Sequence, residues 1–421
     1  MASGTRAASL GITAVIVIVI VLVLGFGIYV DGLLVSSSTT TTVGSETVTV
    51  TQPGSSSSIF FNGSTTTTVV SGSVNHSSDT TTNQTSSPTT VTVVITTTLS
   101  SNGPPYTSLT GCPGPYSGSE YDSNNTISTQ YAPYGIAFDN NTRELFVANS
   151  RSYTVSVINL STNETTSVIP VGALPTGVAF DPVSNEVFVT NTCSNSTSVI
   201  DASTNHVIAN ITVGAYPVYA LYDPVNGCVY VSATGESGNG SLSVINGTNN
   251  KLVTTIPISG SSWGIDLNAA NNEIYVGDHG SSISSTNENI TVVNATSNQV
   301  VGSIPVGETL FGVAYDPANN EIYAANWSGS DVVVINASSG EVIGHIQVGD
   351  AVVGVTYDPY DKNIYAVSNA QDSVSEISSS NNLVINSFGI GPAPKLPVYD
   401  PMNNAIYVSN TGDSSISVLA P

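Results

Sequence analysis

Asp266 is the residue of this sequence whose position points most clearly to chemistry. The same position in the other copies of a repeated strand holds Ala137, Ala179, Leu221, Ala314, Thr356 or Val398. An acid that faces a narrow channel has a raised pKa or a partner, so Asp266 is a candidate for binding a small ligand or an ion. We expect no catalytic residue, because no serine–histidine–aspartate, cysteine–histidine or paired-carboxylate arrangement is identifiable.

Histidine is too scarce for a multi-histidine copper or haem centre. The chain has 4 histidines, and no two of His76, His206, His279 and His345 lie at ligand spacing. We therefore expect no cofactor and no metal. His206 and His345 fall on outer strands, where a structural role is expected. His279 stands beside Asp278 in an inserted loop and is a candidate binding residue.

A second group of candidates stands just before the repeated strand. Its members are Tyr134, Thr176, Tyr219, Trp263, Phe311 and Lys395. Trp327 follows a neighbouring strand on the same face. Exposed aromatic side chains at a channel mouth favour contact with sugars or peptides, so the aromatic members and Trp327 are expected to form a binding surface. The alternative is that they only pack the loops.

Seven copies of one unit carry these positions. An aromatic-Asp-Pro turn recurs, with anchors at Asp139, Asp181, Asp223, Asn268, Asp316, Asp358 and Asp400. The anchors are 42, 42, 45, 48, 42 and 42 residues apart. A period of ~40–45 residues built from short strands is typical of propeller blades. Each turn Asp could suggest a metal site, but Asp-Pro followed by Asn more simply predicts an Asx turn.

Each unit predicts four strands, because its apolar residues alternate with period two. In the first unit we expect strands at 135–138, 145–148 and 155–158, and a fourth that ends at Gly172. The last unit stops after its third strand, whereas residues ~125–130 match the end of a unit. They are expected to complete the last blade and leave no open edge. The fold class is all-β, a seven-bladed propeller.

The two longer spacings place insertions between the second and third strands of their units. The insertions fall at 233–241 and 278–289. They lie on the face that carries the aromatic candidates. Insertions on one face of a repeat protein often mark its binding surface.

The second strand of the units carries the most specific pattern. It reads Phe188-Val189-Thr190-Asn191, with close copies at 146–149, 230–233, 323–326 and 407–410. With the segments "Val-x-Val-Ile-Asn/Asp" and "Ile-Pro-Val-Gly" that follow, it resembles the YVTN family of β-propeller repeats over residues ~125–421. Ala233, Asp278 and Ser368 depart from the final Asn. The resemblance implies a prokaryotic, notably archaeal, exported or surface-layer protein. Calcium-dependent lactonase-like propellers line their channel with several Asn, Asp and Glu, whereas here Asp266 stands alone.

The cysteines and the glycosylation sequons agree with an exported chain. Cys112, Cys193 and Cys228 leave one odd thiol. Cys193 and Cys228 belong to opposite faces and are not expected to pair, so Cys112 with either of them remains open. The Asn-x-Ser/Thr sequons are Asn62, Asn75, Asn83, Asn124, Asn140, Asn159, Asn163, Asn195, Asn210, Asn239, Asn246, Asn289, Asn294, Asn326 and Asn336. They predict a glycan coat.

The N-terminal part predicts a membrane anchor and a stalk. Residues 10–30 are 21 uncharged, largely apolar residues, enough for one transmembrane helix, and Arg6 before them places residues 36–421 outside the cell. A cleaved signal peptide is the alternative. Residues 36–110 contain 41 Ser or Thr among 75 and predict an extended, low-complexity stalk, with local strands at 47–51 and 89–98. The propeller then occupies 111–421, after a cytoplasmic tip and helix in 1–35.

The charge of the chain excludes one class of function. The chain has 6 Lys+Arg against 29 Asp+Glu, a net charge of −23, which excludes a nucleic-acid-binding surface. The hypothesis from the sequence is a membrane-anchored, extracellular scaffold that binds other cell-surface proteins or glycans and is not an enzyme. The alternatives are an exported lactonase-like hydrolase and a sensor that binds a small ligand or metal near Asp266.

Overall fold

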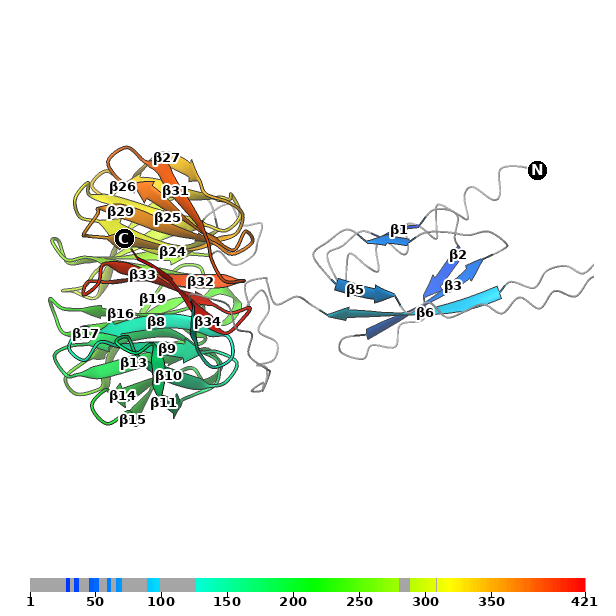
Figure 1. Ribbon diagram of the computed structural model, residues 1–421. Coiled ribbons are helices and arrows are strands. Elements are labelled where there is room, and N and C mark those ends of the chain that lie inside the picture. Colours follow the sequence, from blue (N-terminus) through cyan, green and yellow to red (C-terminus); the bar gives the residue numbers. More distant parts are fainter. Residues whose placement is uncertain are drawn as a thin grey trace, which may run out of the picture. The chain divides into compact units, whose positions relative to one another are not determined.

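The computed structural model describes residues 28–30, 34–37, 45–52, 59–61, 66–69, 89–98, 126–279, 288–307 and 309–420. The chain divides into two compact units, Met1–Pro105 and Tyr106–Pro421. Both units are drawn in Figure 1.

The first unit contains short strands within the Ser/Thr-rich tract. They are β1 (Ile28–Val30), β2 (Leu34–Ser37), β3 (Ser45–Gln52), β4 (Ile59–Phe61), β5 (Thr66–Val69) and β6 (Thr89–Thr98). β3 pairs antiparallel with β6 over its whole length, and these are the two segments in which Thr alternates with Val or Ile. The sheet order is β2-β3-β6-β5, and β1 pairs with β4.

The predicted membrane helix at about 10–30 falls largely outside the described residues. Its last three residues, Ile28–Val30, are a strand rather than part of a helix. Among the residues that the structure describes, no helix has the length and apolar character needed to cross a membrane.

The second unit is a seven-bladed propeller of four-stranded antiparallel sheets (Figure 1). From the axis outward, blades 1 to 3 are β8 (Pro133–Asp139), β9 (Glu144–Asn149), β10 (Thr154–Asn159), β11 (Glu164–Pro170); β12 (Pro175–Asp181), β13 (Glu186–Asn191), β14 (Ser196–Asp201), β15 (His206–Thr212); and β16 (Pro217–Asp223), β17 (Cys228–Ala233), β18 (Ser241–Asn246), β19 (Lys251–Pro257). Blades 4 and 5 are β20 (Ser262–Asn268), β21 (Glu273–Asp278), β22 (Asn289–Asn294), β23 (Gln299–Pro305); and β24 (Leu310–Asp316), β25 (Glu321–Asn326), β26 (Asp331–Asn336), β27 (Glu341–Gln347). Blades 6 and 7 are β28 (Val352–Asp358), β29 (Asn363–Ser368), β30 (Ser373–Ser378), β31 (Leu383–Gly389); and β32 (Pro394–Asp400), β33 (Ala405–Asn410), β34 (Ser415–Leu419), β7 (Thr126–Ser128).

The ring closes as the sequence predicts. β7 comes from the N-terminal end of the propeller and pairs antiparallel with β34 from its C-terminal end, with Ile127 opposite Ile416. The hydroxyl and the backbone N–H of Thr129 both donate to Ser414 O. β32 of the last blade also contacts β8 of the first. The two ends of the repeat therefore stabilise one blade together.

The recurring second strand owes its pattern to contacts between blades. Its aromatic residue reaches the next blade, as Tyr323 donates to Asn382 Oδ1 at 2.7 Å. Its hydroxyl residue reaches the first strand of the next blade, and Ser409 of blade 7 donates to Tyr134 O of blade 1. Its final Asn binds the third strand of its own blade, as Asn191 donates to Ser198 Oγ at 2.9 Å. In these blades the aromatic residue, the hydroxyl residue and the Asn therefore each make a defined contact.

The turns between first and second strands are Asx turns, as predicted. The side-chain oxygen of the turn Asp or Asn accepts the backbone N–H two residues later in all seven blades, as Asp139 does from Asn141 at 2.8 Å. The predicted strand bounds need one correction. The fourth strands end at Pro170 and its equivalents, before the Gly at which they were expected to end, because the chain there turns toward the next blade.

Candidate functional site

Seven side chains lie around one end of the propeller axis, one from the first strand of each blade. They share one position, five residues before the turn Asp or Asn, and we call them the axial ring: Tyr134, Thr176, Val218, Trp263, Phe311, Val353 and Lys395. Each is at most 6% exposed. Val218, Trp263 and Phe311 pack as one cluster from three consecutive blades.

The axial ring corrects two expectations from the sequence. Tyr134, Trp263 and Phe311 are buried, so they do not form an exposed aromatic surface. Tyr219 is not a member of the ring, because Val218 holds that position. Packing of large rings against one another around a narrow axis removes them from solvent.

An aromatic cluster on this face brings together four predicted binding residues. The ring centroids of Trp263 and Phe311 are 4.5 Å apart. His279 meets Phe311 edge-on at 4.6 Å and Trp263 at 5.6 Å, and Trp327 lies 5.2 Å from Phe311. Trp263 and Phe311 form the buried floor, whereas His279 and Trp327 are half-buried. These two side chains are therefore the accessible part of the cluster.

A cavity of about 220 Å³ runs along the axis, and Asp266 is its acid. The first strands of all seven blades line it, and Tyr219 and Thr356 add hydroxyls. The side chain of Asp266 therefore faces the channel, as the sequence predicts. Asp266 Oδ1 accepts the Leu267 N–H at 2.8 Å and Oδ2 accepts the Tyr315 N–H of the next blade at 2.7 Å. Burial raises the pKa of Asp266 to about 6, although both N–H groups act in the opposite direction.

Asp266→Asn should change how stability depends on pH. The carboxyl has a higher pKa in the folded chain than its usual 3.8, so ionisation lowers stability between about pH 4 and pH 6, by up to about 3 kcal/mol. The amide does not ionise. The variant loses one hydrogen-bond acceptor at every pH. Its free energy of unfolding should nevertheless increase relative to that of the parent as the pH rises through this window. Urea denaturation at pH 3.5 and pH 7 measures the change, and two parallel pH profiles would contradict it.

Lys395, which belonged to the second group of candidates but was not expected to bind a partner, is a buried cation. It is 3% exposed, and its Nζ lies 5.9 Å from the centroid of the Tyr134 ring. The ion pair between His345 and Asp331 is the one found among the described residues, so no described carboxylate pairs with Lys395. Burial lowers the pKa of its ammonium to about 8. The repeat gave a signal, because this position is otherwise aromatic, aliphatic or Thr.

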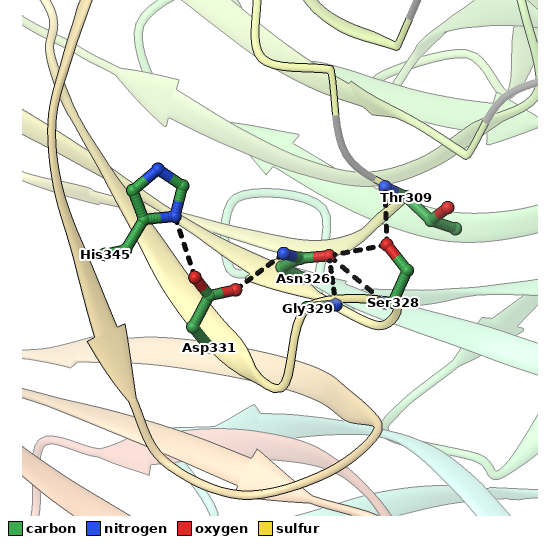
Figure 2. Close-up of polar contacts among 6 residues, drawn as sticks. All are labelled: Thr309, Asn326, Ser328, Gly329, Asp331 and His345. Carbon is green, nitrogen blue, oxygen red and sulfur yellow. Dashed lines mark hydrogen bonds and ion pairs between the residues drawn. The ribbon is translucent and has the colours of Figure 1, made fainter. Parts of the chain in front are cut away.

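The final Asn of the second strand organises the loop that follows it, as blade 5 shows (Figure 2). Asn326 accepts N–H groups from Ser328 and Gly329 and donates to Asp331 Oδ1 at 2.6 Å. Asp331 Oδ2 lies 2.7 Å from His345 Nδ1. The side chain of His345 is half-exposed, and its contact with Asp331 joins the outer strand to the third strand of the blade. This agrees with the structural role expected for it.

Asp278 replaces this Asn in blade 4. It is 2% exposed; among the described residues its Oδ1 has no hydrogen-bond partner, and its Oδ2 accepts the Thr291 hydroxyl at 3.5 Å. Burial raises its pKa to about 8, the Thr291 hydroxyl lowers it, and Glu288 adds to the rise. Across the sheet, Ser262 is fully buried, and its Oγ also has no hydrogen-bond partner in the part of the chain that the structure describes. The change from Asn to Asp278 is visible in the sequence, whereas the burial of its carboxylate is not.

The cysteines of the propeller differ in state. Cys193, in a single 3₁₀ turn at Thr192–Ser194, is disulfide-bonded. Cys228, in β17, is a free thiol. The two do not pair with each other, as expected, and Cys112 lies outside the described residues.

Comparison with known proteins identifies the fold. No family model matches the chain, and no curated protein matches it. Among solved structures, hydrazine synthase of Kuenenia stuttgartiensis is similar over 72% of this chain and 99% of its own, with a TM-score of 0.64 and 18% identity. The WD40 β-propeller domain of Doa1 is similar over 70% of this chain and 95% of its own, with a TM-score of 0.57 and 10% identity. Identities this low show a shared propeller fold and no more.

Proposed function

We propose that the chain is a membrane-anchored member of the YVTN type whose propeller stands outside a prokaryotic cell, in the manner of a surface-layer protein, as a binding scaffold and not a catalyst. The apolar segment at 10–30, the Ser/Thr-rich tract and the sequons support this location. The disulfide of Cys193 supports it further, because disulfides persist in oxidising compartments.

The aromatic cluster carries the proposal of a binding role. Its accessible side chains, His279 and Trp327, sit on a floor of Trp263 and Phe311, and the longest inserted loop begins at His279. A fixed aromatic platform beside polar loops suits the apolar face of a sugar ring. A net charge of −23 favours neutral glycans over anionic ones. The partner is therefore a neutral glycan of a cell-surface glycoprotein or of the envelope.

Trp327→Ala should abolish most glycan capture by intact cells. Cells that produce the full chain are incubated with fluorescent neutral oligosaccharides, and bound label is compared at equal surface amounts of protein. Loss of one stacking ring should weaken binding at least tenfold, since aromatic contacts contribute about 0.5–1.5 kcal/mol beyond the area they bury. Tyr360→Ala is the control, because Tyr360 is 64% exposed and lies in an Asx turn away from the cluster.

Two outcomes would contradict the proposal. Equal capture by parent and Trp327→Ala would remove the aromatic cluster from the binding surface. Absence of capture by cells whose propeller is intact would contradict a glycan-binding scaffold altogether.

A second candidate function is supported by the axial cavity. It presents Asp266 and Tyr219 within a largely apolar lining, which suits a small polar ligand. Both oxygens of Asp266 already accept backbone N–H groups, so the carboxylate is held in place for binding rather than for proton transfer. The axial cavity therefore supports binding of a small ligand better than a lactonase-like activity.

A further inference from the structure

The strands of the propeller divide its glycosylation sequons between two faces. Consecutive strands of a blade are antiparallel, so the turns after the first and third strands lie at one end of the sheet, which we call the turn face. The opposite end, the loop face, carries the axial ring and the aromatic cluster. A sequon is usable in the folded chain where its Asn Nδ2, which bonds to the sugar, and its hydroxyl residue are both accessible.

Six sequons lie on the turn face. Four of them share one repeated position, the last residue of the third strand, in blades 1, 3, 4 and 5. At this position the Asn Oδ1 accepts the backbone N–H two residues later, as Asn246 does from Thr248 at 3.1 Å. No described residue accepts a hydrogen bond from Nδ2 of any of the six. The six are Asn140, Asn159, Asn163, Asn246, Asn294 and Asn336.

The hydroxyl residues of these six sequons are all exposed. Thr296 and Ser338 accept hydrogen bonds from neighbouring amides and keep their own protons. The Thr142 hydroxyl donates to Asp139 Oδ2 at 2.7 Å. Asn140, which precedes Thr142 by two residues, should therefore be modified less than the other five.

Two sequons of the loop face have buried hydroxyl residues. Thr197, of the Asn195 sequon, is fully buried, and Thr291, of the Asn289 sequon, is 5% exposed. The Thr291 hydroxyl also donates to Asp278 Oδ2 at 3.5 Å. A glycosyltransferase could reach either hydroxyl only by displacing the start of the third strand of its blade.

The other two described sequons of the loop face have an engaged amide nitrogen. Asn326 is fully buried, and its Nδ2 donates to Asp331 Oδ1 at 2.6 Å (Figure 2). Asn239 is exposed, but its Nδ2 donates to Glu236 O at 3.1 Å, and Ser241 of this sequon is half-buried. Asn239 is therefore the least protected of the four and gives the strictest test.

We propose that the folded propeller carries its N-linked glycans on the turn face and keeps the loop face bare. In the modification, Asn Nδ2 bonds to the anomeric carbon of a lipid-linked sugar phosphate, the bond from that carbon to the phosphate oxygen breaks, and Nδ2 loses one proton. Bulky glycans would keep other molecules from the turn face, so partners would reach the propeller at the loop face. This inference rests on the export proposed above but not on what the aromatic cluster binds.

Glycopeptide mapping of the full chain from its native cells tests the proposal. The chain is purified in detergent and cut with chymotrypsin, since 19 Tyr and 9 Phe offer more cleavage sites than 6 Lys+Arg. Mass spectrometry with electron-transfer fragmentation then locates each glycan. The turn-face sites should be occupied at least about tenfold more than Asn195, Asn239, Asn289 and Asn326.

Two substitutions that complete a sequon give a matched gain test. Asp201→Asn completes one at the repeated turn-face position of blade 2, where Asp201 already accepts the Ser203 N–H at 2.8 Å. Gln371→Ser, at an exposed position, completes one on the loop face at Asn369, which is 1% exposed and donates from Nδ2 to Pro394 O at 2.7 Å. Asp201→Asn should add the mass of one glycan, and Gln371→Ser should add none.

Three outcomes would overturn the proposal. They are occupancy at Asn239 or another loop-face site equal to that of the turn face, a glycan gained by Gln371→Ser, and a turn face without glycans. In the last case a protease added to intact cells separates two failures. Cleavage of the propeller would leave the proposed location standing, whereas protection from the protease would contradict the location as well.

Discussion

Lys395→Met is expected to stabilise the propeller by about 2–3 kcal/mol at pH 7. The ammonium is 3% exposed and has no described carboxylate partner, and its contact with the Tyr134 ring offsets only part of the desolvation. Methionine keeps the length of the side chain and removes the charge. Urea denaturation of the full chain at pH 7 measures the gain.

The pH dependence identifies the cause of this gain. The pKa of Lys395 falls from 10.5 to about 8 on folding, so its cost is absent above about pH 10.5 and complete below about pH 8. The advantage of Lys395→Met should therefore shrink to less than about 1 kcal/mol at pH 10. Lys251→Met, at an exposed lysine of β19, should change stability by less than about 0.5 kcal/mol at either pH. A destabilised Lys395→Met at pH 7 would mean that the ammonium has a stabilising partner.

The blades could be predicted because each repeats local rules. Alternation of apolar residues predicts the strands. Turn residues such as Asp139 form Asx turns, in which the side-chain oxygen accepts the backbone N–H two residues later. The closing strand followed from a missing fourth strand and a match at 125–130. Strand ends were less predictable, since they depend on how the chain crosses to the next blade.

The site could be predicted only in part. Asp266 was located by its odd residue type in a repeat, and Trp327 and His279 by their loops. Val218 stands five residues before Asp223, so it holds the axial-ring position of its blade. The sequence pattern favoured the neighbouring Tyr219 for this position because Tyr219 is aromatic. Whether a carboxylate pairs with Lys395 depends on which of seven distant strands meet at the axis, and a local sequence pattern does not show this; none of the described carboxylates does.

Ile127→Ala is expected to destabilise the propeller by about 2–5 kcal/mol, the usual cost of emptying a buried isoleucine site. Ile127 is 4% exposed and packs with Phe138, Leu145 and Ile416 across the closing and first blades. β7 is only three residues long and is held to β34 by three residue pairs. Its release would leave the edge of β34 unpaired and open the ring at the junction of its ends.

The strands that lose hydrogen-exchange protection show whether Ile127 closes the ring or only fills the core. Hydrogen exchange in Ile127→Ala should accelerate first at Ser415–Ser417, whose strand pairs with β7, while inner strands such as β17 keep their protection. Val168→Ala, in the outer strand of blade 1, is the matched control, because Val168 is 42% exposed and its truncation should cost less than about 0.5 kcal/mol. Equal losses in the two variants, or exchange that accelerates uniformly through all blades, would show that β7 does not secure the ring. A loss confined to blade 7 would show that the two ends of the repeat hold the propeller closed through Ile127.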